Sequence, residues 1–182
     1  MNRQRWSLGR LAGLELSAGP SALLGSVALA GLLTAVLRRA GRSPYHTAAV
    51  TAAAIPLHWT ADLWHHIGHA AAARQTGYPM RGVHFWGVLG TSLYPVDEPP
   101  LPAEVHIRRA LGGPAASLIA AVLSAVLWRL SPRKGPARDL ALITLLEHLN
   151  LGFGALLPVP IFDGGTIRTW WPRRRLPAGE TG

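Results

Sequence analysis

Residues 47–73 read TAAVTAAAIPLHWTADLWHHIGHAAAA, an apolar stretch that carries five ionisable side chains between residues 58 and 69. Within this stretch, His65-His66-Ile67-Gly68-His69 has the spacing of the H-E-x-x-H motif. In that motif two histidines at i and i+4 bind zinc, and the glutamate beside the first acts as general base. Both histidine positions are filled here, whereas His66 stands at the glutamate position. The pattern indicates a metal-binding helix without its usual base.

The five ionisable side chains fall on one side of the predicted helix. Because each helical residue advances by about 100°, they share a face roughly 100° wide. Ionisable groups at membrane depth are costly, and they normally face a bundle interior or a water-filled cavity. A lone histidine is explained well enough as a hydrogen-bonded core residue, but a stripe of five favours a functional site. The stripe consists of His58, Asp62, His65, His66 and His69.

Composition and hydropathy place this helix in a membrane. The chain is 49% hydrophobic and 15% charged, whereas soluble domains average about 25% charged residues. Apolar segments of this length can cross a hydrocarbon core of about 30 Å. The sequence therefore predicts an all-α membrane protein, with one domain over residues 1–182 and about four transmembrane helices. The predicted spans lie near residues 20–37, 47–73, 112–130 and 140–157.

The linker between the second and third spans has its own pattern. Residues 82–90 read GVHFWGVLG, with the glycine and aromatic content of a small hairpin or re-entrant strand. This element follows the breakers Gly77 and Pro79.

The charge pattern indicates a lipid partner. The net charge is +9, but the basic residues form short groups between apolar runs, as at membrane flanks facing anionic head groups. No basic face with interleaved aromatic residues is present, so we expect no nucleic-acid partner. Seventeen of the 18 basic residues are arginine, which indicates a GC-rich prokaryotic source. We expect an integral protein of a prokaryotic plasma membrane.

Two histidines need a third ligand, because a catalytic zinc ion takes three protein ligands and one open position. The chain has no cysteine, so that ligand must be histidine or a carboxylate. The best candidate is Asp163, in the turn that ends Phe162-Asp163-Gly164-Gly165, although such a turn is common in proteins of any function. Glu147, a carboxylate inside an apolar segment, is the rival ligand.

Three motifs in the right order resemble those of the site-2 protease family, which are intramembrane zinc metalloproteases. Residues 65–70, HHIGHA, resemble the family's H-E-x-G-H-A, and residues 113–117, GPAAS, resemble its G-P-x-x-N. Residues 156–165, LLPVPIFDGG, resemble the end of its N-L-L-P-x-x-x-x-D-G-G. The resemblance extends from about Ser17 to Thr166. It implies that His65, His69 and Asp163 bind Zn²⁺, and that the cleaved bond lies in a membrane-spanning substrate.

The chain departs from the family pattern at three polar positions. His66 replaces the glutamate, Ser117 replaces the asparagine of the second motif, and Ala155 replaces the asparagine of the third. The resemblance therefore implies metal ligands without the usual general base.

Three roles remain open for His66. It can act as a substitute base, because imidazole carries protons near neutral pH and Asp62 lies one turn away. It can instead complete a closed metal site, or the site can be inactive. The predicted function is a metalloprotease of membrane-spanning segments with a divergent base. The alternatives are an inactive pseudoprotease that binds metal and transmembrane clients, or a histidine-lined ion path.

Overall fold

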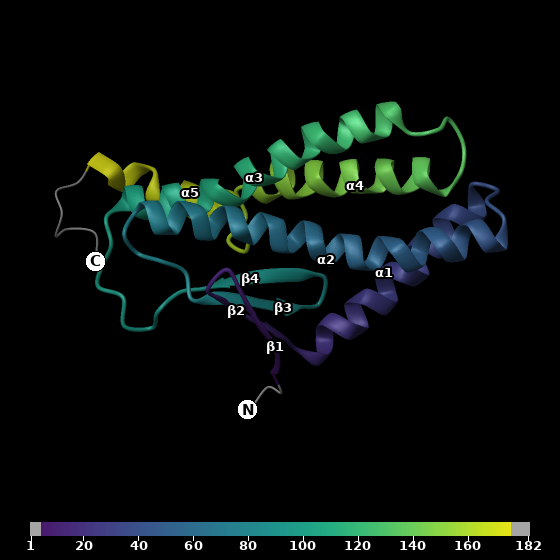
Figure 1. Cartoon of the computed structure of the whole chain (residues 1–182). Coiled ribbons are helices and arrows are strands. Elements are labelled where there is room, and N and C mark those ends of the chain that lie inside the picture. The colour runs from purple at the N-terminus through teal and green to yellow at the C-terminus, as the bar shows by residue number, and fades with distance from the viewer. Residues whose placement is uncertain (1–4, 176–182) are drawn as a thin grey trace.

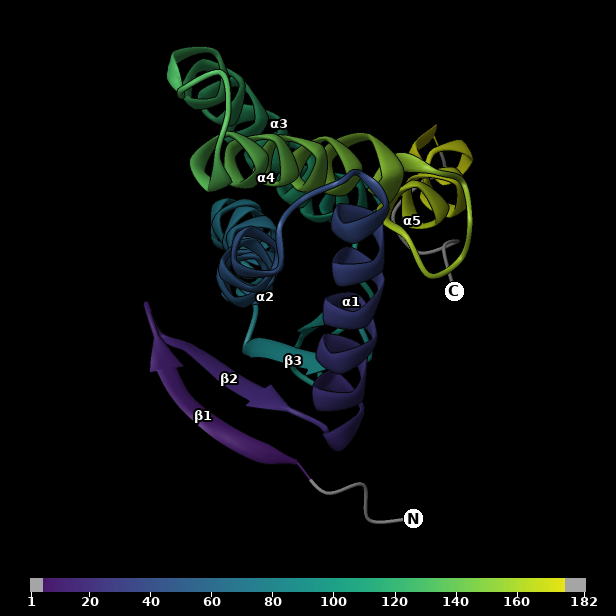
Figure 2. The same cartoon turned by 90° about the vertical axis from the view of Figure 1, so that its right-hand side faces the viewer.

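The computed structural model describes residues 5–175, which form a helical bundle with a small sheet along one side (Figure 1). The longest helix lies between the sheet and a layer made by the third and fourth helices, as both ribbon views show (Figure 2). The helices are α1 (Pro20–Arg39), α2 (Pro44–Gln75), α3 (Ala103–Leu130), α4 (Pro136–Phe153) and α5 (Asp163–Trp170), with 3-10 turns η1 (Gly154–Leu156) and η2 (Pro172–Arg175).

Helix α2 carries the histidine stripe and begins with strong local signals. The Ser43 side chain accepts a hydrogen bond from the His46 amide, and Pro44 occupies the first helical position. The helix contains 32 residues, which corresponds to about 48 Å at 1.5 Å per residue. It is therefore longer than a hydrocarbon core of about 30 Å.

Helices α2 and α3 cross at very short range. A Cβ atom on Gly68 would lie 2.3 Å from the Gly112 carbonyl oxygen, and one on Gly112 would lie 2.4 Å from that of Gly68. Small residues at a crossing let helix backbones approach closely, as is common in membranes. This contact brings the second half of α2 against the start of α3.

The sheet has four strands in the order β1-β2-β3-β4. The two hairpins, β1–β2 and β3–β4, are antiparallel, and β2 pairs with β3 in parallel. Strand β4 has a strand partner on one side only within the described residues. The strands are β1 (Trp6–Leu11), β2 (Leu14–Ala18), β3 (Gly82–Trp86) and β4 (Leu89–Leu93).

A compact apolar cluster fixes the sheet against α2. Leu14 of β2, Val83 and Phe85 of β3, and Ala70 and Ala73 of α2 are all buried in it. At the other end of the hairpin, a Cβ atom on Gly25 of α1 would lie 1.9 Å from the Gly87 carbonyl oxygen. The β3–β4 hairpin is thus held between α1 and α2.

The predicted fold class, an all-α membrane protein with a hairpin between the second and third spans, is confirmed at this level. The sheet is larger than predicted, because the hairpin pairs with residues 6–18, which the sequence did not single out. Helix α3 starts at Ala103, ahead of the predicted residue 112. Asp163 begins helix α5 and does not lie in an isolated turn, which corrects that expectation.

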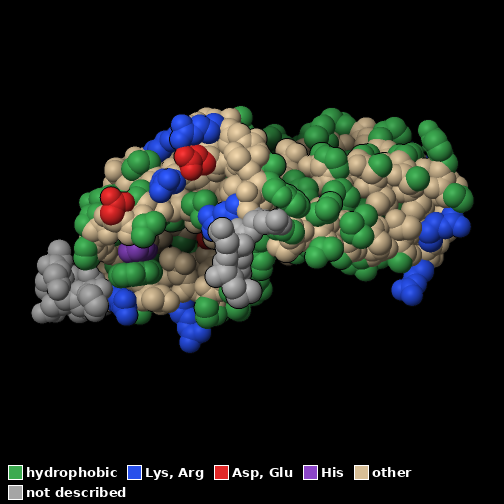
Figure 3. All heavy atoms as spheres, turned by 90° about the horizontal axis from the view of Figure 1, so that it is seen from below, with side chains coloured by type: hydrophobic (Ala, Val, Ile, Leu, Met, Phe, Trp, Pro, Cys, Tyr) green, Lys and Arg blue, Asp and Glu red, His purple; other side chains and the backbone are tan. Residues whose placement is uncertain are grey.

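Hydropathy and surface agree with a membrane location. Three helices in the described part of the chain are long and apolar enough to cross a membrane: residues 20–39, 103–130 and 136–156. Helix α2 is not among them, so its crossing stays a prediction. On the face seen in Figure 3, a band of hydrophobic and uncharged side chains separates the charged residues of the sheet half from the arginines at the far end. These features are those of an integral membrane protein.

Candidate metal centre

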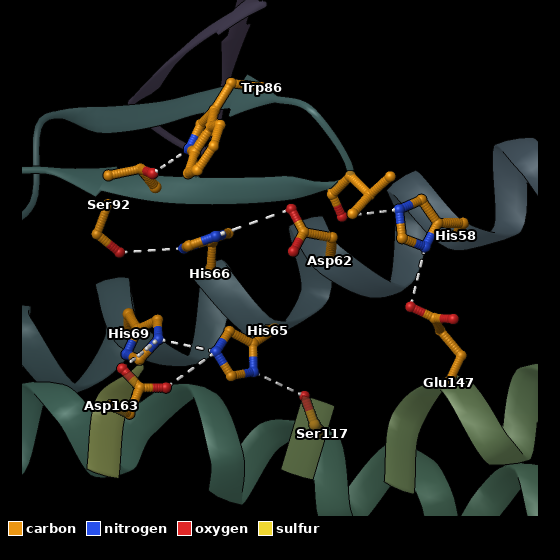
Figure 4. A network of polar contacts seen from close by, with 12 residues as sticks. His58, Asp62, His65, His66, His69, Trp86, Ser92, Ser117, Glu147 and Asp163 are labelled. Atoms are coloured by element: carbon orange, nitrogen blue, oxygen red, sulfur yellow. Dashed lines mark hydrogen bonds and ion pairs between the residues drawn. The ribbon is translucent and has the colours of Figure 1, made fainter. Parts of the chain in front are cut away.

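Two helices bring three potential metal ligands together. His65 and His69 lie one turn apart on α2, and their Nε2 atoms are 3.0 Å from each other. Asp163, at the start of α5, places Oδ2 3.2 Å from His65 Nε2 and Oδ1 3.4 Å from His69 Nε2. One ligand atom from each residue lies within 4.8 Å of the others, and both histidines are buried. This triangle is labelled in Figure 4.

Each histidine is oriented through its second ring nitrogen. His69 Nδ1 donates to the Arg109 carbonyl oxygen at 2.7 Å, and His65 Nδ1 lies 3.0 Å from the Ser117 hydroxyl. A carbonyl oxygen can only accept, so the Nε2 atom of His69 carries a lone pair. Partners of this kind fix the tautomer and orientation of histidines that bind metals.

The triangle fits a small cation. Two imidazole nitrogens facing each other at 3.0 Å need either a shared proton or a cation between them. Ligand atoms of a tetrahedral zinc ion with bonds of about 2.0–2.1 Å are separated by about 3.3 Å. The distance between the two Nε2 atoms is close to this value, and each Nε2 atom lies at a similar distance from one of the two oxygens of Asp163. Two imidazoles and a carboxylate are also a usual zinc ligand set.

A glycine of α3 leaves room for the rings of His65 and His69. A Cβ atom on Gly113 of α3 would lie 2.4 Å from His69 Nε2 and 2.5 Å from His65 Nε2. The motif GPAAS thus begins with the one residue type that lets the α3 backbone face both ring nitrogens. The three residues predicted as ligands are therefore brought together in a geometry suited to zinc.

The remaining members of the stripe point elsewhere. His66 Nδ1 lies 3.0 Å from the Ser92 hydroxyl of β4, and His66 Nε2 lies 3.8 Å from Asp62 Oδ2 (Figure 4). Neither ring nitrogen of His66 belongs to the potential ligand group. His66 and Asp62 thus face the sheet, whereas His65 and His69 face α3 and α5.

Glu147 lies apart from the ligand triangle. Its Oε1 atom is 2.9 Å from Nδ1 of His58, and Nε2 of that histidine is 3.1 Å from the Val88 carbonyl oxygen in the β3–β4 turn. The rival ligand therefore has another partner. His58 links α4, α2 and the hairpin.

A cavity of about 600 Å³ opens beside the triangle. All three potential ligands line it, together with Asp62 and His66, and strand β4 forms one wall. At its rim the Arg109 guanidinium pairs with Glu98 at 2.6 Å and lies over the Tyr94 ring at 4.1 Å. Burial raises the pKa of Tyr94, so its hydroxyl stays a neutral donor. The cavity is large enough for a peptide segment beside the metal ligands.

Sequence reasoning missed several partners of these side chains. Ser117 was noted only as a departure from a family motif, yet it contacts His65. Ser92 and the backbone of Arg109 carried no signal at all, because no spacing rule links them to α2. Gly113 was noted only as part of the GPAAS motif. Its position opposite the two histidines of α2 is seen in the structure alone.

The described residues thus define a mostly helical membrane protein with a histidine and carboxylate site suited to a metal ion. No family model and no curated protein matches the sequence. Among solved structures, the site-2 protease from Methanocaldococcus jannaschii is similar, with a TM-score of 0.67 and 19% identity over 95% of this chain and 74% of that one. The chain shares the fold of that membrane protease.

Proposed function

We propose that this chain is an intramembrane zinc metalloprotease-like protein of the site-2 type, acting on peptide bonds in membrane-spanning segments. The observation that carries the proposal is the triangle of His65, His69 and Asp163 in the wall of a cavity. The shared fold with a site-2 protease supports it. A zinc ion held there would supply Lewis acidity, polarising a carbonyl group and activating water.

The residues around the triangle support the binding of an extended substrate. Strand β4 forms a wall of the cavity and has a free edge among the described residues. Extended peptides commonly add to such an edge through backbone hydrogen bonds. A segment bound along β4 would lie in the cavity, close to the potential metal ligands.

His66 occupies the position at which the motif has its general base. Imidazole can move protons near neutral pH. Asp62, 3.8 Å from Nε2 of His66, would stabilise its protonated form. We propose His66 as the base and Asp62 as the residue that positions it.

The second candidate function is that of a pseudoprotease that binds metal and transmembrane clients without cutting them. A specific observation favours it: the ring nitrogens of His66 face Ser92 and Asp62 and not the triangle. Loss of a general base typically lowers a rate by about 10²–10⁴-fold. The two functions therefore differ in turnover and not in metal content.

Metal content tests the site itself. We expect one zinc ion per chain in the purified protein, measured by plasma mass spectrometry, and its loss from His65→Ala and Asp163→Ala. His84→Ala changes a histidine on the sheet and should retain the metal. Zinc that persists in both ligand variants would overturn the ligand assignment.

Turnover separates protease from pseudoprotease. A reporter with a membrane-spanning segment is incubated with wild type and with His66→Glu, which restores the motif glutamate. Equal cleavage by the two proteins would exclude the pseudoprotease. Cleavage by His66→Glu alone would show that the fold and metal are intact and that wild type lacks a working base.

A further inference from the structure

Three side chains on the cavity wall stand in the order of a serine hydrolase triad. The Ser92 hydroxyl lies 3.0 Å from His66 Nδ1, and the opposite ring nitrogen lies 3.8 Å from Asp62 Oδ2 (Figure 4). The order of a hydroxyl, an imidazole and a buried carboxylate is that of the triad, which recurs on unrelated folds. The two ring nitrogens have exchanged roles relative to the common arrangement.

The contacts favour the tautomer that a triad needs. With its proton on Nε2, the side facing Asp62, His66 presents a lone pair on Nδ1 to the Ser92 hydroxyl. The Asp62 side chain is only 4% exposed, and its Oδ2 atom has no hydrogen-bond partner among the described residues. A distance of 3.8 Å is too long for a direct hydrogen bond, so Asp62 acts on the ring through its charge.

The surroundings of Ser92 suit an extended acyl substrate. Ser92 and His66 both line the cavity. The free edge of β4 offers unpaired backbone N–H groups, which can stabilise the oxyanion of a tetrahedral intermediate. A Cβ atom on Gly90 would lie 2.4 Å from both Asp62 Oδ2 and His66 Nε2, so glycine keeps the strand close to the pair.

We infer that Ser92, His66 and Asp62 form a second hydrolytic centre, in which Ser92 is the nucleophile toward an ester or peptide carbonyl lying along β4. The Ser92 Oγ–carbon bond forms as the bond to the leaving group breaks. The hydroxyl proton passes to His66 Nδ1 and then to the leaving group. Water then hydrolyses the acyl-serine, delivers the acid product and restores the hydroxyl. This chemistry goes beyond the proposed metalloprotease and needs no metal, although it uses His66 and Asp62 in a different role.

The chain contains an internal control for this centre. Ser17 of β2 lies 3.0 Å from Nδ1 of His84, the same distance and the same ring nitrogen as in the Ser92 pair. Within residues 5–175, no carboxylate lies within 4.0 Å of the His84 ring nitrogens. The two pairs therefore differ in the presence of the acid and in their position at the cavity.

A fluorophosphonate probe tests the inference directly. It reacts with activated serines by forming an Oγ–phosphorus bond, with loss of fluoride and the hydroxyl proton. The full chain in detergent micelles is treated with the probe, and modified serines are mapped by mass spectrometry. We expect labelling at Ser92 and not at Ser17. Ser92→Ala should abolish it, and Asp62→Asn should slow it by about tenfold or more.

The mapping on wild type keeps the test valid if a variant fails to fold. Equal labelling of Ser92 and Ser17, or equal labelling of Ser92 in native and denatured protein, would overturn the inference. Labelling that survives a zinc chelator supports it, and labelling that the chelator abolishes overturns its independence from the metal. Zinc without Ser92 labelling would refute this centre alone, and labelling without zinc would refute the proposed metalloprotease alone.

Discussion

At the scale of single residues, the proposed metal site requires a residue without a side chain at position 113. Gly113 lies in α3 opposite both Nε2 atoms of the ligand histidines. We expect Gly113→Ala to lower zinc affinity at least tenfold, because the new methyl group would lie 2.4 Å from His69 Nε2 and 2.5 Å from His65 Nε2 and would displace both rings. Competition with a chromogenic zinc chelator measures the change.

The control for this substitution is another helical glycine. A Cβ atom on Gly31 of α1 would meet nothing within 4 Å. Gly31→Ala should therefore leave zinc affinity unchanged, while it removes the same backbone freedom. If Gly113→Ala bound zinc as tightly as Gly31→Ala, the ligand geometry would be wrong.

The Ser117 hydroxyl is the partner that orients His65. Side chains that hydrogen-bond to metal ligands and orient them typically contribute 10–100-fold to metal affinity. We expect Ser117→Ala to weaken zinc binding by about that range, again measured by chelator competition. Ser124→Ala removes another buried hydroxyl from the same helix and should have no effect on the metal. A similar loss in both variants would indicate a general packing defect and contradict the proposed role.

The grouping of the three proposed ligands was predictable from the sequence, and the partners of their side chains were not. His65 and His69 are set by helical spacing, and Asp163 followed from a turn of glycines after a long apolar segment. The partner Ser117 lies 52 residues from His65 along the chain. Helix crossing decides such contacts, and no local pattern reports where two helices cross.

At the scale of elements, His58 fastens the β3–β4 hairpin to the bundle. It contacts Glu147 of α4 at 2.9 Å and the Val88 carbonyl oxygen in the hairpin turn at 3.1 Å. We expect His58→Ala to speed amide hydrogen exchange in residues 82–93 by roughly threefold to tenfold. A hydrogen bond to a neutral carbonyl group contributes about 0.5–1.5 kcal/mol, and the hairpin would lose the one between His58 and Val88.

A matched contact elsewhere provides the control. His46 lies 2.9 Å from Asp139, the same distance as in the His58 pair, at the opposite end of α2. His46→Ala should speed exchange near that contact and leave the hairpin protected. If both variants loosened the hairpin equally, the anchor would not be specific to His58.

The hairpin of residues 82–93 was predictable from its glycines and aromatic residues, whereas the β1–β2 hairpin was not. All six residues of β1 are exposed, so no buried face gives the alternation that marks a strand. The strand exists because β2 offers a free edge to it. The signal available in the sequence is Gly13, a residue common in tight hairpin turns. In the structure, Ala12 and Gly13 of this turn both have positive φ.

At the scale of the whole molecule, the exposed apolar side chains offer positions at which contact with lipid and contact with water can be told apart. Leu32 of α1 is 64% exposed and Val122 of α3 is 66% exposed, while Val96 in the loop after β4 is 97% exposed. The chain has no cysteine, so a spin label can be placed at any one of them alone. In bilayers, we expect oxygen to relax labels at 32 and 122 more than a water-soluble nickel complex does, with the reverse at 96.

A buried neighbour completes the comparison. Ala121 is 4% exposed and adjoins Val122 on the same helix. A label there should be poorly accessible to both relaxing agents, because protein and not lipid surrounds it. Strong relaxation by the nickel complex at residues 32 and 122 would contradict the membrane assignment of α1 and α3.

The parallel pairing of β2 with β3 has a consequence for biogenesis. Parallel neighbours require a crossover connection, and here the crossover consists of α1 and α2. If α2 crosses the membrane as predicted, two crossings return the chain to the side of the bilayer from which it started. Strand β2 pairs with β1 as soon as both are made, but its other edge stays open until β3 has been synthesised. We therefore expect the β2–β3 ladder to form only after α1 and α2 are in place.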